Sequence, residues 1–171
     1  MTGTPTVDST AAHDEVVTLI RTIPDAALDW QPGGTDWSLR QIVSHLAHAN
    51  DFYVMIVDEV HASKFGTVRL HRELAGVQRM AATDAEVARC TNVLATLDCF
   101  ERAYRRLWAV LNTLTPEELD RPFVLYSWQP DAEPDATSLR QRVIRRATDH
   151  LREHQAQLKD TLTRWQATHT A

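Results

Sequence analysis

The sequence predicts an all-α four-helix bundle with a long connection before the last helix. The chain has only five glycines in 171 residues, its apolar residues recur with helical spacing almost throughout, and no stretch alternates strongly enough to indicate several paired strands. Four amphipathic helices bury their apolar faces most simply against one another. We expect one domain over residues 1–171, with residues 1–7 as a frayed terminus.

Stop and start signals place the four helices, which we expect to run antiparallel. Pro24 ends the first helix, and Ser38 is a typical N-cap for the second. Thr83 and Glu86 have the spacing of a capping box at the start of the third. The expected helices cover residues 9–23, 38–62, 83–112 and 137–165.

Two connections are long. Residues 63–82 carry a weaker helical pattern, which fits a short extra helix. Residues 114–136 hold Pro116, at the first position of a single helical turn, and three further prolines. Connections of this length are often functional. The connection over residues 114–136 carries the aromatic residues Phe123, Tyr126 and Trp128. They could cover the mouth of a pocket, cap the end of the bundle or contact a second subunit.

Composition excludes several classes of protein. The formal net charge of -5, from 23 acidic and 18 basic residues, gives no general attraction for nucleic acid. No apolar run could span a bilayer and no leader pattern is seen, so we expect a soluble, cytoplasmic protein without a membrane partner. Cys90 and Cys99 fall in one expected helix, about 13 Å apart, which is too far for a disulfide. The sequence contains no CxxC pair, which excludes a zinc ribbon and a thioredoxin-like redox site.

Three histidines lie on the apolar faces of the expected helices. In "ATDHLREHQAQL", His150 and His154 share a stripe with Leu151 and Leu158, while charged residues occupy the opposite face. His45 lies on the apolar face of the second helix, and His48 lies about 60° further round. No role is assigned to His13, His61, His71 and His169.

The spacing of these histidines predicts a metal site. A pair at i and i+4 presents two imidazoles on one face, and His45 from a facing helix would complete three ligands with a fourth position open. The alternative is that each imidazole is hydrogen-bonded in the core without a metal. "HLREH" has Leu151 where a zinc protease carries its catalytic glutamate, which argues against that class. Zinc is the first expectation for the ion, with nickel and iron as alternatives.

The segments "DWQPGGTDWSLRQIVSHLAH" and "DHLREHQAQL" resemble the DinB-like family, which includes YfiT-type thiol transferases. The resemblance covers nearly the whole chain. It implies a four-helix bundle in which His45, His150 and His154 bind one divalent metal ion. It also implies an S-transferase that joins a low-molecular-weight bacterial thiol, of the bacillithiol or mycothiol type, to an electrophilic small molecule. The metal would deprotonate the thiol, so no side-chain base is assigned.

Two other functions remain open at this point. With water in place of the thiol, the same site would serve a metal-dependent hydrolase. The chain could also be a non-catalytic, metal-binding stress-response module, and a homodimer is compatible with each function. Glu101, on the apolar side of the third helix, is either a boundary residue or an acceptor for a ligand histidine.

Overall fold

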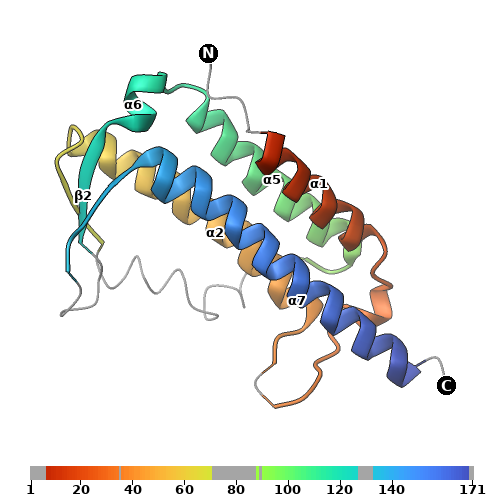
Figure 1. Ribbon diagram of the computed structural model, residues 1–171. Helices are drawn as coiled ribbons and strands as arrows, with labels where there is room; N and C mark the ends of the chain where they lie inside the picture. Colours follow the sequence, from red (N-terminus) through yellow and green to blue (C-terminus); the bar gives the residue numbers. More distant parts are fainter. Residues whose placement is uncertain (1–6, 35, 71–87, 89, 127–132, 170–171) are drawn as a thin grey trace.

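Four long helices form a bundle in the computed structural model, which describes residues 7–34, 36–70, 88, 90–126 and 133–169. The helices are α1 (Val7–Arg21), α2 (Leu39–Ala62), α5 (Val93–Leu111) and α7 (Arg146–His169) (Figure 1). The predicted four-helix bundle is confirmed. Among the described helices, none combines the length and the apolar character needed to cross a membrane.

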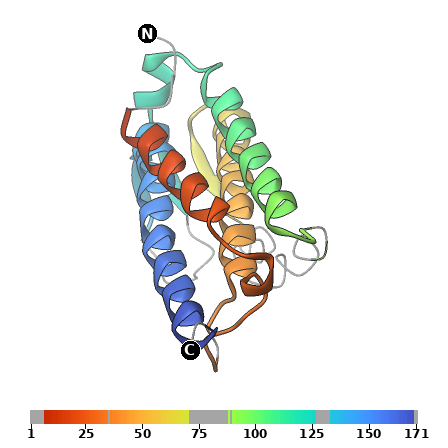
Figure 2. The ribbon, with the colours of Figure 1, turned by 90° about the vertical axis from the view of Figure 1, so that its right-hand side faces the viewer.

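The helices are not arranged as a simple series of antiparallel hairpins. α2 packs against both α5 and α7, and α1 closes the bundle against the same two helices (Figures 1 and 2). α2 and α5 run in the same direction, opposite to α1 and α7. The expectation that all neighbours are antiparallel is therefore wrong. α2 has 24 residues and is about 36 Å long, and residues 63–92 are numerous enough to return the chain along that length.

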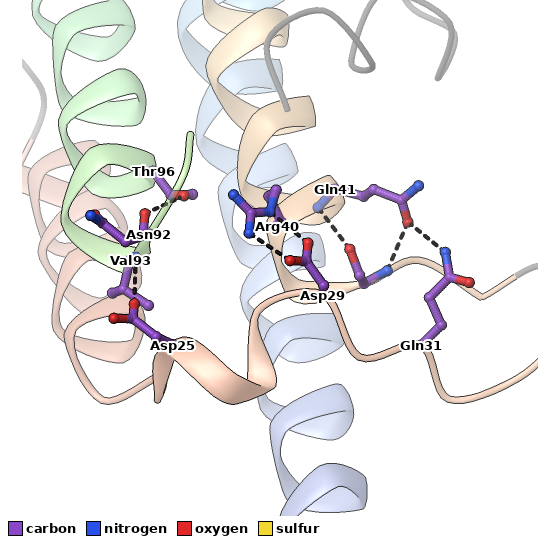
Figure 3. Close-up of polar contacts among 9 residues, drawn as sticks. Asp25, Asp29, Gln31, Arg40, Gln41, Asn92, Val93 and Thr96 are labelled. Carbon is purple, nitrogen blue, oxygen red and sulfur yellow. Dashed lines mark hydrogen bonds and ion pairs between the residues drawn. The ribbon is translucent and has the colours of Figure 1, made fainter. Parts of the chain in front are cut away.

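The start of α2 is fixed by side chains, as the sequence predicts. The hydroxyl of Ser38 accepts a hydrogen bond from the Gln41 N–H at 3.3 Å, and Gln41 Oε1 accepts from the Ser38 N–H at 2.9 Å (Figure 3). Arg40 donates to both carboxylate oxygens of Asp29 at 2.6 Å, which ties the preceding loop to the helix. This capping box sets the rotational phase of α2, and hence the direction in which His45 points two turns later.

The start of α5 is later than expected. Residues 90–92 are not helical, and Asn92 is the N-cap, with its side-chain oxygen accepting from the Ala95 N–H at 2.9 Å. Asp25, the first residue of the short helix η1 (Asp25–Ala27), accepts from the Val93 N–H at 2.8 Å (Figure 3). The prediction of one helix over residues 83–112 is wrong at this point, because two acceptors terminate the helix here.

The late start of α5 places Cys90 and Cys99 in different segments. Cys90 precedes the helix, so the predicted helical spacing from Cys99 does not apply. Both are nonetheless free thiols, as expected. The predicted capping box of Thr83 and Glu86 lies outside the described residues, as does most of the weak helical pattern of residues 63–82.

A small sheet closes one end of the bundle, beside the short helix α6 (Pro116–Asp120) (Figure 1). Its strands β1 (Thr67–Arg69), β2 (Pro122–Tyr126) and β3 (Asp135–Ser138) lie in that order. β1 pairs with β2 in parallel, and β2 pairs with β3 antiparallel. The expectation of no paired strands is wrong here, because β1 has three residues and the outward side chains of β2 are also apolar, which hides its alternation.

Within β2, Phe123 and Leu125 are buried, so this part of the 114–136 connection caps the end of the bundle core. Tyr126 stacks under Arg69, whose guanidinium carbon lies 4.1 Å from the ring centroid. Trp128, the third aromatic residue of the connection, lies outside the described residues.

The last helix begins close to the expected residue but with a different backbone. Helical structure starts at Leu139, where the hydroxyl of Ser138 accepts from the Gln141 N–H at 3.4 Å. A π-helix, η3 (Arg140–Arg145), precedes α7 without a break. π-helical turns within α-helices are rare and occur frequently at functional sites.

Candidate metal site

Three histidine nitrogens meet between α2 and α7. His150 Nε2 lies 3.1 Å from His45 Nε2 and 3.0 Å from His154 Nε2. The candidate ligand atoms of the three residues all lie within 4.8 Å of one another. Tetrahedral ligands about 2.0–2.1 Å from a zinc ion are about 3.3 Å apart, so small side-chain adjustments would let all three bind one ion. The structure thus brings together the three histidines selected from the sequence.

The helices determine this convergence. His150 and His154 are one turn apart on α7, with ring centroids 4.5 Å apart. His45 reaches them from α2, with ring centroids 5.0 Å from His150 and 4.8 Å from His154. α2 and α7 are directly packed and run in opposite directions (Figure 1). A pair on one helix and a single residue on its neighbour therefore form a triangle, in which nitrogens from both helices face each other.

Two neighbours hold the imidazoles in place. Trp37, just before the N-cap of α2, packs edge-on to His45 with ring centroids 4.8 Å apart and stacks on His154 at 6.0 Å. His154 Nδ1 lies 2.7 Å from Gln157 Oε1. Because that oxygen only accepts, Nδ1 carries the proton, and Nε2 keeps its lone pair directed toward the other two histidines.

All three imidazoles are neutral at physiological pH. Burial, together with the nearby His154 and His48, lowers the pKa of His45 to about 4. Burial is also the main cause that lowers the pKa of His150 to about 3, assisted by His154, His45 and Arg146. The pKa of His154 is lowered by burial as well. Neutral imidazoles are the form that binds metal ions.

A pocket opens beside the histidines. It has a volume of about 240 Å³, and its wall includes His45, His150, Phe52, Tyr53, Arg142 and Arg146. The described residues that line it include no carboxylate. Burial raises the pKa of Tyr53 to about 12, so its hydroxyl stays protonated at neutral pH. The site therefore has a small, partly apolar cavity with positive charge on one side.

Other candidates from the sequence lie elsewhere. His48 lines the pocket but is outside the three-histidine group. Glu101 lies 3.8 Å from Arg21 and 3.9 Å from Arg105, which fits a boundary residue. In the part of the chain that the structure describes, no hydrogen bond joins Glu101 to the histidine group; Gln157 occupies the accepting role instead.

The histidines without an assigned role are also away from the site. His13 stacks on Tyr104, with ring centroids 3.9 Å apart. His61 packs near Phe65, and His169 stacks on Trp165. His71 lies outside the described residues.

Sequence reasoning missed Gln157, Tyr53, Arg142 and Arg146. Gln157 could have been found by its position three residues after His154, one turn along the same face. Arg146 is one turn before His150, and Arg142 one turn before that. Their spacing matches that of the histidine pair, and this repeat of four is the signal that was overlooked.

Comparisons with known proteins agree with this architecture. Residues 10–158 match a protein-family model described as the DinB superfamily. The chain is also similar to a solved structure of YfiT from Bacillus subtilis, with a TM-score of 0.62 and 21% identity, over 92% of this chain and 83% of that one. That protein is described as "a probable metal-dependent hydrolase with an unusual four-helix bundle topology". A search of curated proteins found no significant match.

Proposed function

The chain belongs to the DinB superfamily, and from that premise we propose that it is a metal-dependent thiol S-transferase. It joins a low-molecular-weight bacterial thiol, of the bacillithiol or mycothiol type, to an electrophilic small molecule. The observation that carries the proposal is the convergence of His45, His150 and His154 at the wall of a pocket. The reaction takes place in the cytoplasm, where such thiols are kept reduced.

The donor set fits one divalent ion. Three neutral nitrogen ligands suit zinc, nickel or iron, and zinc is the first choice. They would leave the charge of the ion uncompensated, and the pocket beside them has room for a further ligand. When bound, the ion would supply the chemistry by lowering the pKa of a thiol that enters that position.

The residues of this chain provide the setting for that chemistry. Burial keeps the imidazoles unprotonated, so protons do not compete for their lone pairs. Gln157 fixes the tautomer and ring orientation of His154. Trp37 covers two of the rings and limits the access of water on its side. Tyr53, protonated and in the pocket wall, is available to donate a hydrogen bond to the electrophile.

Hydrolysis is the second candidate, favoured by the description of the YfiT structure. An attacking water must lose its proton, and metallohydrolases commonly use a nearby carboxylate as the base. None of the described lining residues carries a carboxylate. A thiol is far more acidic than water and needs no such base, so the composition of the pocket supports thiol transfer.

The test is turnover by untagged, metal-loaded protein on a panel of electrophiles, with and without each bacterial thiol. Thiol-dependent consumption that disappears in His150→Ala supports the proposal. Turnover that needs the metal but no thiol would establish the hydrolase instead. If no electrophile is consumed under either condition while the metal remains bound, the chain is a non-catalytic metal-binding module.

A further inference from the structure

A four-residue repeat along η3 and α7 places two arginines in line with two histidines. Arg142, Arg146, His150 and His154 follow one another at this spacing. In a regular α-helix each such step turns the side chain by about 40°, so the ends of the series would diverge. Arg142 lies within η3, where the wider π-helical turn reduces this drift. Both arginines and His150 consequently line the same pocket.

The two arginines differ in their partners. Arg146 donates to both carboxylate oxygens of Glu153, at 2.6 and 3.2 Å, and this exposed pair orients its guanidinium. Arg142 is half-buried, and it makes no hydrogen bond or ion pair within the described ranges. Arg145 and Arg146, three and four residues further along the helix, both carry the same charge as Arg142. A guanidinium that lines a pocket and has no acceptor among the described residues is available to an anionic ligand.

The surroundings select a carboxylate on a small molecule. Arginine presents a planar fork that matches a carboxylate. The neighbouring walls, Phe52, Tyr53 and Ala49, add no negative charge, and His45 and His150 are neutral. A cavity of about 240 Å³ leaves room for a carboxylate-bearing group between the arginines and the histidines.

We propose that Arg142, supported by Arg146, binds a substrate carboxylate while the reacting atom of the substrate meets the three histidines. This inference rests on the proposed thiol transfer and narrows its substrate class. The carboxylate belongs either to the thiol itself or to the electrophile. A carboxylate held at one end of the pocket would orient the substrate and select against neutral analogues.

Matched small thiols test the proposal by direct binding. Cobalt-loaded protein is titrated with 3-mercaptopropionate and with 2-mercaptoethanol, which differ in the carboxylate, and binding is followed by thiolate-to-cobalt charge-transfer absorption. We expect 3-mercaptopropionate to bind roughly tenfold more tightly, as one charge-assisted contact allows. Arg142→Gln should remove this preference and leave the binding of 2-mercaptoethanol and the metal content unchanged.

Arg145→Gln is the control variant. Arg145 is the next arginine along the chain, three residues after Arg142. Its side chain is 80% exposed, and it is paired with Asp149 rather than placed in the pocket wall. This variant should keep the preference for 3-mercaptopropionate. Arg142→Lys should retain part of it, because the charge remains and the fork is lost.

Propionate distinguishes the two sources of the carboxylate. If 3-mercaptopropionate has no advantage, but saturation-transfer NMR detects propionate binding beside 2-mercaptoethanol in an Arg142-dependent manner, the carboxylate belongs to the electrophile. If neither thiol reaches the metal while propionate still binds through Arg142, the subsite stands and thiol transfer fails. Equal behaviour of wild type and Arg142→Gln toward every one of these probes would overturn the proposal.

Discussion

His154 and Gln157 form a hydrogen bond of 2.7 Å between Nδ1 and Oε1, one turn apart on α7. This contact is outside the group of three converging nitrogens, yet it determines which nitrogen of His154 would be available to a metal. It makes the amide of Gln157 a positioning group for the site.

Gln157→Ala should weaken metal binding by about tenfold or more, because His154 loses the acceptor that fixes its tautomer. Competition with a chromophoric chelator measures the affinity. Gln155→Ala is the matched control, since Gln155 also lies on α7 but donates to Glu15 at 2.8 Å, away from the histidines. Equal losses in both variants would mean that the effect comes from the helix and not from the hydrogen bond.

Replacement of a single ligand should reduce metal binding more strongly. His45→Ala and His150→Ala are each expected to lower the affinity by at least about a hundredfold, beyond the usual effect of an outer partner. His48→Ala should retain metal, because His48 lines the pocket without joining the nitrogen group. Metal analysis after dialysis gives the answer. A metal-depleted His48→Ala protein would show that the assignment of the ligands is wrong.

The metal-free protein should lose stability as the pH falls from about 6.5 to about 3. In the unfolded chain both His45 and His150 titrate near 6.5, while burial holds their pKa values in the fold at about 4 and about 3. Below pH 6.5 the unfolded state therefore binds more protons than the folded state, and the free energy of unfolding falls as pH falls. Above pH 6.5 this contribution is constant.

Urea denaturation at pH 7, 6 and 5 measures this loss in the free energy of unfolding. A His150→Phe variant, which removes one of the two groups, should show a shallower decline across the same range. Zinc added to the wild-type protein should raise the unfolding midpoint at pH 7 and lose its effect on acidification, because protons then compete with the metal for the imidazoles. Wild type and His150→Phe with the same slope would rule out His150 as a cause.

The start of α5 gives a prediction about stability alone. Asn92→Ala removes the acceptor of the Ala95 N–H and should lower the free energy of unfolding by about 1 kcal/mol. Asn112→Ala, at the other end of α5, should have a smaller effect, because its contribution to the cap comes from its backbone N–H. Thermal or urea unfolding compares the two. A larger loss from Asn112→Ala would contradict the placement of the N-cap.

The inward direction of the three histidines could be predicted because His45 and His150 lie within regular helical turns, where 100° per residue holds over short distances. The start of α5 could not be predicted, since Val93 is capped by Asp25, which is 68 residues earlier in the chain. The repeat of four points to Arg142, but its place in the pocket wall depends on the π-helical turn, which a regular helical period does not anticipate.

The direction of α5 depends on the path of a connection, and residue types alone do not specify that path. Likewise β2 reads as a short apolar run, and only its pairing with β1 and β3 reveals a strand. Local patterns therefore identified the bundle and the histidine group, whereas features that need a distant partner became visible only in the folded chain.

His45 and His150 are separated by 105 residues in the chain, and nothing local brings them together. During synthesis the first of these histidines leaves the ribosome long before the last helix has been made. The triangle of nitrogens can form only after α7 has docked on α2. A metal site built on it would therefore be complete only in the folded chain, and a chain that ends before α7 would lack two of the three candidate ligands, His150 and His154.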